Sequence, residues 1–309
     1  MSARPRWGAL DAARGLAVVA MVVFHLIWDL GHFGHIAASI PWSAPVKAFG
    51  HAIAFSFLFI AGVSLVLANE GHMRWPAFWR RFAIIAGAAA LVSAGTYAIF
   101  PAAFVFFGIL HCIAAASLVA LPFLRGPWLL AAAAGAFFFA APHVLASPVF
   151  NSNWLQWLGL STTEPLTQDW RPLFPWAGAL LLGVAAAKAL PLPVPAGGRE
   201  DRLPRASAAL KLLGRHSLLI YLAHQPILFA VFSMLAFFSP APDETADFVA
   251  ACETSCRADG AGQQYCHDAC LCTAQEALRT KALAGAADDA ERGRRLNAIA
   301  RRCMGNGKK

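Results

Sequence analysis

The sequence predicts an all-α protein: a polytopic membrane helix bundle of about seven transmembrane helices, followed by a small disulfide-stapled helical tail at the C-terminus. Composition is the first observation, because 58% of the 309 residues are hydrophobic and only 14% are charged, whereas about a quarter are charged in soluble domains. The second is a set of seven long apolar runs, and the third is that six of the seven cysteines lie between Cys252 and Cys303. A soluble enzyme and a disordered protein are both excluded by this composition.

The positive charge is distributed as in a membrane protein. The formal net charge is +8, and residues 239–309 contribute nothing to it because they carry ten basic and ten acidic residues. The excess lies in residues 1–238, almost entirely in short loops between the apolar runs. That pattern is typical of membrane orientation and not of a nucleic-acid-binding face, so no nucleic-acid partner is expected.

Each apolar run has about 17 to 22 residues, enough to cross roughly 30 Å of hydrocarbon at 1.5 Å per residue. The runs must be helices, because lipid offers no hydrogen-bond partner to an open backbone. Little more than Phe100-Pro101-Ala102 separates the third run from the fourth, which predicts a tight hairpin. The runs cover residues 12–31, 48–69, 82–99, 103–123, 127–145, 174–190 and 217–238.

Lysine and arginine predict the orientation. With a cytoplasmic N-terminus, eleven basic residues fall in inner loops and only Lys47 and Arg171 in outer loops, as expected for a bacterial inner-membrane protein. The first run resembles a signal sequence, but it lacks a small-residue cleavage site and carries His25 and Asp29, so we expect an uncleaved first helix. The predicted domains are a membrane domain, 1–238, and a periplasmic tail, 239–309.

The tail cysteines predict disulfides. Cys252-x3-Cys256, a glycine-containing turn and Cys266-x3-Cys270 place two cysteine pairs on one face of each of two antiparallel helices. This geometry favours Cys252–Cys270 and Cys256–Cys266, which leaves Cys272 for Cys303. A zinc site is the alternative, although zinc modules usually have C-x2-C spacing. Disulfides require an oxidising compartment, which agrees with the charge distribution, and we expect the tail to be a cap without chemistry.

The first run carries a polar stripe. Arg14, His25, Asp29 and His32 are spaced by 11, 4 and 3 residues, and they fall within about 60° of one another on a helix. Because ionisable groups in lipid are expensive, the stripe is a candidate functional site. Asp29 can accept the N–H of His25 and raise its basicity, as a general base requires. The alternative is a His–Asp pair that only ties helices together.

Two further histidines lie at mid-depth, His111 and His224, and a polar cavity shared with His25 is the favoured interpretation. His51 is a candidate for the outer side of this cavity. Asp169 and Arg171 precede the sixth run, either at the cavity mouth or as an interfacial anchor. No metal-binding or phosphate-loop motif is present, so no metal is predicted.

The loops on either side permit two interpretations each. Outer-loop aromatic and amide side chains suit a sugar, but an interfacial aromatic belt has the same composition; these residues are Trp42, Asn151, Asn153, Trp154, Trp157 and Trp170. On the inner side Arg80, Arg81 and Arg215 suit the phosphates of a cytoplasmic donor. The positive-inside rule alone would also place them there.

Several segments together resemble a known family. Residues 6–232 are similar to bacterial membrane proteins of the heparan-α-glucosaminide N-acetyltransferase catalytic-domain type. The matching segments are Leu10-Asp11-Ala12-Ala13-Arg14-Gly15, Phe24-His25, Gly108-Ile109-Leu110-His111, Asp169-Trp170-Arg171, Pro175-Trp176 and Gly214-Arg215 through Tyr221 to His224-Gln225-Pro226.

The resemblance implies transfer of an acyl group, usually acetyl, from cytoplasmic acyl-CoA to a sugar or glycan on the other side of the membrane. It implies His25 as the leading catalytic residue and Arg14 on the donor side, while His32 or His35 could replace His25 in that role. We expect His111, His224 or a nearby donor to stabilise the oxyanion, and direct transfer and an acyl-histidine intermediate both remain open. His32, His35, Asp169, Arg171 and Trp176 are the expected acceptor-side residues.

Two other function classes use the same residue types. Intramembrane His and Asp also serve as proton relays in transporters, although no inverted repeat is visible. A bis-histidine haem protein would need two histidines facing each other across helices. A homo-oligomer is compatible with the sequence, and the cysteine-rich tail lies outside the resemblance.

Overall fold

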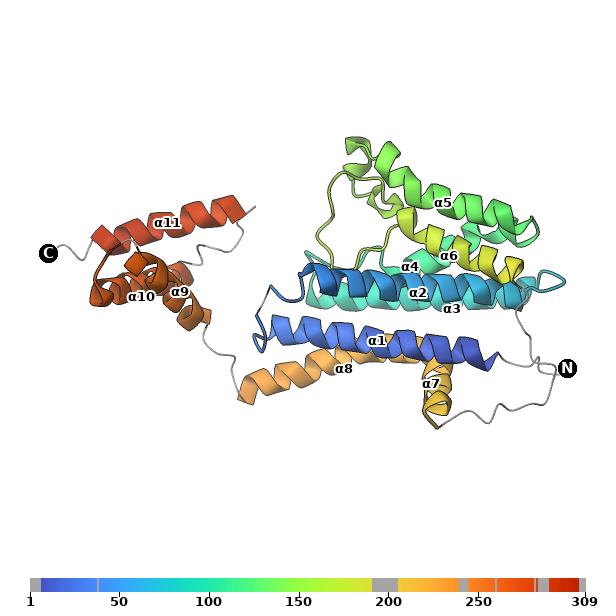
Figure 1. The fold of residues 1–309 in the computed structure, drawn as a ribbon, viewed down its shortest axis with the longest axis horizontal. Coiled ribbons are helices and arrows are strands. Elements are labelled where there is room, and N and C mark those ends of the chain that lie inside the picture. The colour runs from blue at the N-terminus through green and yellow to red at the C-terminus, as the bar shows by residue number, and fades with distance from the viewer. Residues whose placement is uncertain are drawn as a thin grey trace. The chain divides into compact units, whose positions relative to one another are not determined.

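The computed structural model describes residues 7–37, 39–190, 205–238, 244–258, 260–280, 282 and 289–305, and within these ranges all the regular elements are helices (Figure 1). The all-α prediction is therefore confirmed. The chain divides into two compact units, Met1–Trp28 with Ser39–Phe229 and Asp29–Ala38 with Ala230–Lys309. The predicted domain boundary after residue 238 borders residues outside the described ranges and stays a prediction.

The apolar runs form the helices of a membrane protein. Five of the described helices, α1, α2, α3, α5 and α8, are long and apolar enough to cross a membrane. The other two runs form shorter apolar helices, α4 with 11 residues and α6 with 17. The bounds are α1 Gly8–His32, α2 Ala44–Ala68, α3 Trp75–Ile99, α4 Ile109–Val119, α5 Trp128–Leu145, α6 Leu173–Ala189, α7 Arg205–Arg215 and α8 Ser217–Phe238.

The fourth run corrects the expectation of seven full-length spans. A turn does follow α3, where the Ala103 N–H donates to the Phe100 carbonyl at 2.9 Å, but residues 100–108 join α3 to α4 in place of the predicted tight hairpin. The helix begins only at Ile109, because the intervening backbone pairs with residues 168–171: the Arg171 N–H donates to the Phe107 carbonyl at 3.1 Å. An irregular segment is tolerated at membrane depth when protein satisfies its polar groups. The side chains of this irregular segment are apolar, so its composition does not distinguish it from a membrane-spanning helix.

A lysine satisfies the backbone where the α4 segment ends. After α4 a short 3₁₀ turn, Leu121–Leu124, leads toward α5. The Lys188 ammonium on α6 donates to the carbonyls of Phe123 at 2.9 Å and Leu124 at 3.0 Å, and also to that of Gly126. These carbonyls would otherwise lack partners at a helix end.

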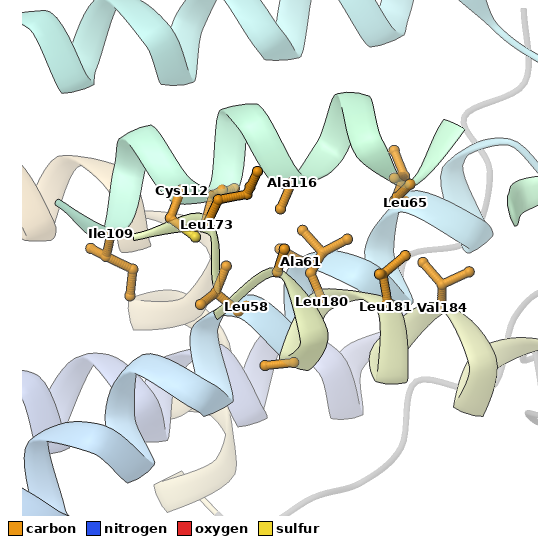
Figure 2. Packing of buried hydrophobic residues seen from close by; sticks show 14 of the residues in the cluster. Leu58, Ala61, Leu65, Ile109, Cys112, Ala116, Leu173, Leu180, Leu181 and Val184 are labelled. Atoms are coloured by element: carbon orange, nitrogen blue, oxygen red, sulfur yellow. The ribbon is translucent and has the colours of Figure 1, made fainter. Parts of the chain in front are cut away.

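The core of the membrane unit lies where α2, α4 and α6 meet (Figure 2). Leu58, Leu180 and Leu181 are fully buried there. Two glycines allow α2 and α6 to approach closely, because a Cβ at Gly62 would collide with the Leu180 carbonyl oxygen and one at Gly183 with that of Phe59. Such close backbone approach is the usual basis of helix association in lipid, where hydrophobic burial between helices contributes little free energy to association.

The short helix α7 packs against α1 through the same kind of close backbone contact at glycines. A Cβ at Gly15 would collide with the Leu210 carbonyl oxygen, and a Cβ at Gly214 with that of Asp11. The two backbones are therefore in contact, and α7 fixes the first turns of α1 in place.

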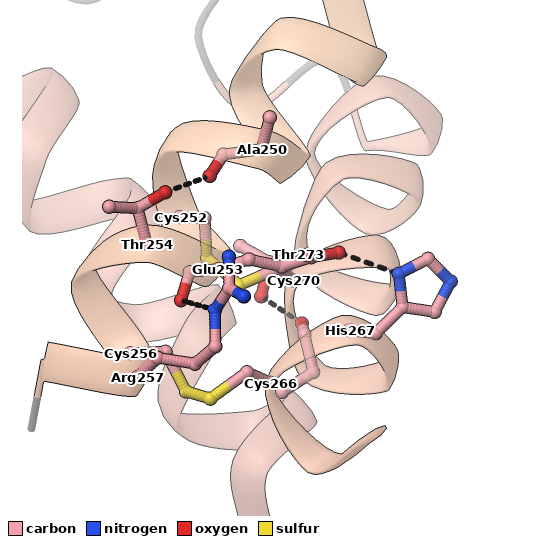
Figure 3. Close-up of a disulfide and its surroundings, with 11 residues drawn as sticks. Ala250, Cys252, Glu253, Thr254, Cys256, Arg257, Cys266, His267, Cys270 and Thr273 are labelled. Atoms are coloured by element: carbon pink, nitrogen blue, oxygen red, sulfur yellow. Dashed lines mark hydrogen bonds and ion pairs between the residues drawn. A yellow bond between two sulfur atoms is a disulfide. The ribbon is translucent and has the colours of Figure 1, made fainter. Parts of the chain in front are cut away.

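The tail consists of three helices, α9 Glu244–Ala258, α10 Gln263–Arg279 and α11 Asp289–Gly305. All three predicted disulfides are confirmed: Cys252–Cys270, Cys256–Cys266 and Cys272–Cys303. Figure 3 shows the first two bonds joining α9 to α10 side by side, with Glu253 and His267 paired at 2.6 Å beside them. The sulfur atoms are thus disulfide-bonded and are not zinc ligands.

Candidate active site

Two of the mid-membrane histidines meet directly. His25 on α1 and His224 on α8 are 199 residues apart, yet Nδ1 of His25 lies 3.1 Å from Nε2 of His224. Their ring centroids are 4.7 Å apart with an edge-on arrangement. The structure thus brings His25 of α1 and His224 of α8 into contact, while the predicted cavity shared by His25, His111 and His224 stays a prediction.

The hydrogen bonds of the pair determine where its protons sit. Nδ1 of His224 faces the carbonyl oxygens of Ile220 and Tyr221, at 3.1 and 2.8 Å, so it carries a proton and leaves Nε2 as an acceptor. Nδ1 of His25 faces that acceptor and also the Met21 carbonyl, at 3.0 Å, so it too carries a proton. Nε2 of His25 is then unprotonated and makes no hydrogen bond with the described residues. It is a free base.

His111 is held differently. Its Nδ1 accepts the Gly108 N–H at 3.2 Å, and its Nε2 lies 3.2 Å from the Ser93 hydroxyl. That hydroxyl donates to the Val105 carbonyl at 2.6 Å, so His111 must donate to it. Both ring nitrogens of His111 are thus engaged in bonds that join α3, α4 and the segment between them.

Three residues expected on the acceptor side lie together. Asp169 accepts the Ile109 N–H at 2.9 Å, which places a carboxylate at the N-terminus of α4, where the helix dipole favours negative charge. The Nε atom of Arg171 is 3.7 Å from Asp169, and its guanidinium lies over the Trp176 ring at 5.2 Å. The His51 ring is 5.5 Å from the same Trp176.

Asp169 and Arg171 also influence the histidine pair electrostatically. The charges of both Asp169 and Arg171 act on His25, and Asp169 also acts on His111. Burial of the ring is the largest influence on His25 and disfavours an imidazolium there, whereas the charge of Asp169 favours it and that of Arg171 opposes it. The site thus contains a free base and one carboxylate that favours its charged form.

The arginines expected on the donor side cluster around Asp11. Asp11, only 7% exposed, is 3.0 Å from Nη1 of Arg14 and 3.6 Å from Nε of Arg215. Arg14 also donates to the Ser64 hydroxyl on α2. Along α1, Arg14 lies about 16 Å from His25.

Arg81 and Arg80 occupy different positions on α3. Arg81 lines a small cavity with Leu65 and Ser117, its charge acts on that of Arg14, and it makes no hydrogen bond or ion pair with the described residues. An uncompensated guanidinium in an apolar cavity suits an anionic group. Arg80 is exposed on the same helix.

The remaining predicted residues belong to the second unit. Asp29, one turn beyond His25 on α1, is fully buried. The His32 ring lies 5.0 Å from that of Phe33, and the His35 ring 5.7 Å from that of Phe232. His25 donates its N–H to the Met21 carbonyl and to His224, so the orienting role predicted for Asp29 stays a prediction, as do the roles of His32 and His35.

Three participants had no predicted role. Asp11 holds Arg14 and Arg215, and its i, i+3 spacing from Arg14 was a usable signal. Ser64 and Ser93, which bond Arg14 and His111, are distant in sequence from their partners and carried no signal. The haem alternative does not fit the pair, because a direct hydrogen bond between His25 and His224 leaves no space for iron between them.

The chain matches a known family over most of its length. The sequence model described as heparan-alpha-glucosaminide N-acetyltransferase, catalytic, matches residues 6–226. Comparisons with curated proteins and with solved structures gave no match.

Proposed function

Because the chain belongs to the heparan-α-glucosaminide N-acetyltransferase catalytic family, we propose that it transfers an acetyl group from cytoplasmic acyl-CoA to a sugar or glycan acceptor outside the cytoplasm. The family makes the protein a membrane acetyltransferase; the donor, the acceptor and the sidedness are our proposal. The observation that carries it is the free Nε2 of His25, beside His224 and on the same helix as Arg14.

The reaction uses His25 as a general base. Nε2 takes the proton of the acceptor amine or hydroxyl as the acceptor atom attacks the thioester carbonyl carbon. The tetrahedral intermediate then collapses, the carbon–sulfur bond breaks, and the thiolate leaves with the proton from His25. Asp169 stabilises the transient imidazolium, and the Nδ1 bonds to Met21 and His224 hold the ring in the required tautomer. The same free Nε2 suits an acyl-histidine route, in which it attacks the thioester itself.

The donor end of the site is assigned to Arg14, Arg81 and Arg215. Acyl-CoA carries several phosphate charges, and arginine is well suited to bind phosphate. Arg81 fits this role best, since the described residues give it no counter-ion, whereas Asp11 partly neutralises the other two. The acceptor end is assigned to Asp169, Arg171 and Trp176, whose ring and charges suit a sugar.

We further propose the bacterial inner membrane as the location, with a cytoplasmic N-terminus and a periplasmic tail. The loop charges support this orientation. The three disulfides of the tail support it independently, because disulfides persist in oxidising compartments.

The test is an assay in proteoliposomes with labelled acetyl-CoA and a panel of amino sugars and envelope glycans. His25→Ala should lower the rate by about 10² to 10⁴, the contribution typical of a general base, with little change in thermal stability. The control is His143→Ala, which removes an exposed histidine at the end of α5. Full activity of the His25 variant would overturn the mechanism, and no transfer by the unaltered protein to any acceptor would overturn the function.

A further inference from the structure

An acyl-transfer site needs a hydrogen-bond donor for the negative charge that develops on the carbonyl oxygen. The histidines nearest the free base do not supply one. His224 uses its single N–H on the carbonyls of Ile220 and Tyr221, and its other nitrogen accepts from His25. His111 uses its N–H on Ser93. Arg171 directs Nε toward Asp169 and donates from Nη1 to the Trp170 carbonyl, which leaves part of its five N–H groups unassigned.

Tyr221 is a polar side chain beside the pair whose donor is unused among the described residues. Its ring centroid is 5.9 Å from that of His224, which follows it by three residues on α8. The charges of Asp169 and Arg171 act on it, as they do on His25. Within the described part of the chain, its hydroxyl makes no hydrogen bond.

The ring of Tyr221 is held by apolar packing on both sides. The side chain packs against two hydrophobic clusters, one that contains Val18, Met21 and Ile53 and one built around Leu58. Met21 is also the residue whose carbonyl holds His25. A phenylalanine would fill this position equally well, and it would avoid the cost of a polar group among apolar side chains.

We propose that Tyr221 is a catalytic residue whose hydroxyl donates a hydrogen bond to the thioester carbonyl oxygen as it becomes an oxyanion. The assignment rests on the proposed acyl transfer. The phenol keeps its proton throughout: it stabilises charge, while His25 moves the proton. The role expected of His111 or His224 is thereby given to a residue of the same α8 turn as His224.

Tyr221→Phe tests this directly, because it removes one oxygen atom and leaves the ring. In the proteoliposome assay kcat should fall about 10²-fold, as for loss of one oxyanion donor, with KM for acetyl-CoA unchanged and thermal stability equal or higher. The pH dependence of kcat/KM should stay that of the unaltered protein, since His25 still accepts the proton. Tyr97→Phe is the matched control, as Tyr97 lies exposed on α3.

The outcomes separate the two proposals. If Tyr221→Phe transfers within threefold of the unaltered protein while His25→Ala is inactive, the role of Tyr221 is wrong and the proposed function stands. If the pH profile shifts with the loss of rate, Tyr221 acts on the proton of His25 and the oxyanion assignment is also wrong. If the unaltered protein transfers nothing, the failure belongs to the proposed function.

Discussion

His25 and His111 are both histidines in apolar helices of the same unit, and the use of their ring nitrogens differs. At His111 both nitrogens are engaged, one by Gly108 and one by Ser93. At His25 a single nitrogen carries both bonds, to Met21 and His224, and the other is free. Burial and residue type are therefore poor guides to catalysis in a membrane bundle. What distinguishes a reactive histidine is an unused nitrogen.

The largest effect in this comparison is expected from the partner of His25. His224→Ala removes the ring that accepts the Nδ1–H and leaves His25 held by the Met21 carbonyl alone. We expect kcat to fall about 10²-fold, the effect of a misplaced catalytic group, with KM little changed. Steady-state kinetics in proteoliposomes measures this, and a rate equal to that of the His143→Ala control would show that the pair does not position His25.

An intermediate effect is expected at Asp169, whose charge acts on both His25 and His111. Asp169→Asn keeps an acceptor for the Ile109 N–H but removes the charge that acts on His25. We expect kcat to fall about tenfold, or roughly 1.4 kcal/mol of transition-state stabilisation, and thermal stability to fall slightly because the helix dipole of α4 loses its anion. Kinetics and thermal unfolding of the same preparation separate the two effects; stability loss without rate loss would limit Asp169 to a capping role.

The smallest effect on rate is expected at His111. His111→Ala leaves Ser93 and the Gly108 N–H without this partner, at a cost of about 1–3 kcal/mol in stability. The melting temperature should fall clearly, while kcat, measured well below it, should stay within threefold. A loss of rate comparable to that of His224→Ala would remove the distinction between the two histidines.

Local patterns were predictable from the sequence. The i, i+4 cysteines specified both neighbouring disulfides of the tail, because the spacing itself fixes which faces meet. The polar stripe placed His25 and Arg14 on one helix, since helical periodicity needs no tertiary information. The apolar runs also gave the helices, which lipid imposes on any spanning segment.

Tertiary pairing was not predictable. The bond between His25 and His224 joins residues 199 positions apart, and no periodicity reports it. The late start of α4 depends on a backbone segment some 60 residues away, whose N–H groups bond the carbonyls of Ala103 and Phe107 in place of helical N–H groups. Tyr221 lay within a recognised segment, but its unused hydroxyl becomes visible only when the partners of its neighbours are known.

Lys188 has a consequence for how charges in membrane sequences are counted. Its ammonium is shared among three main-chain carbonyls, much as an ammonium ion is held by the oxygens of a crown ether. The charge is thereby satisfied within the protein. A lysine of this kind caps the end of a helical segment elsewhere in the chain. Its position therefore gives no information about the side of the bilayer on which its own helix ends.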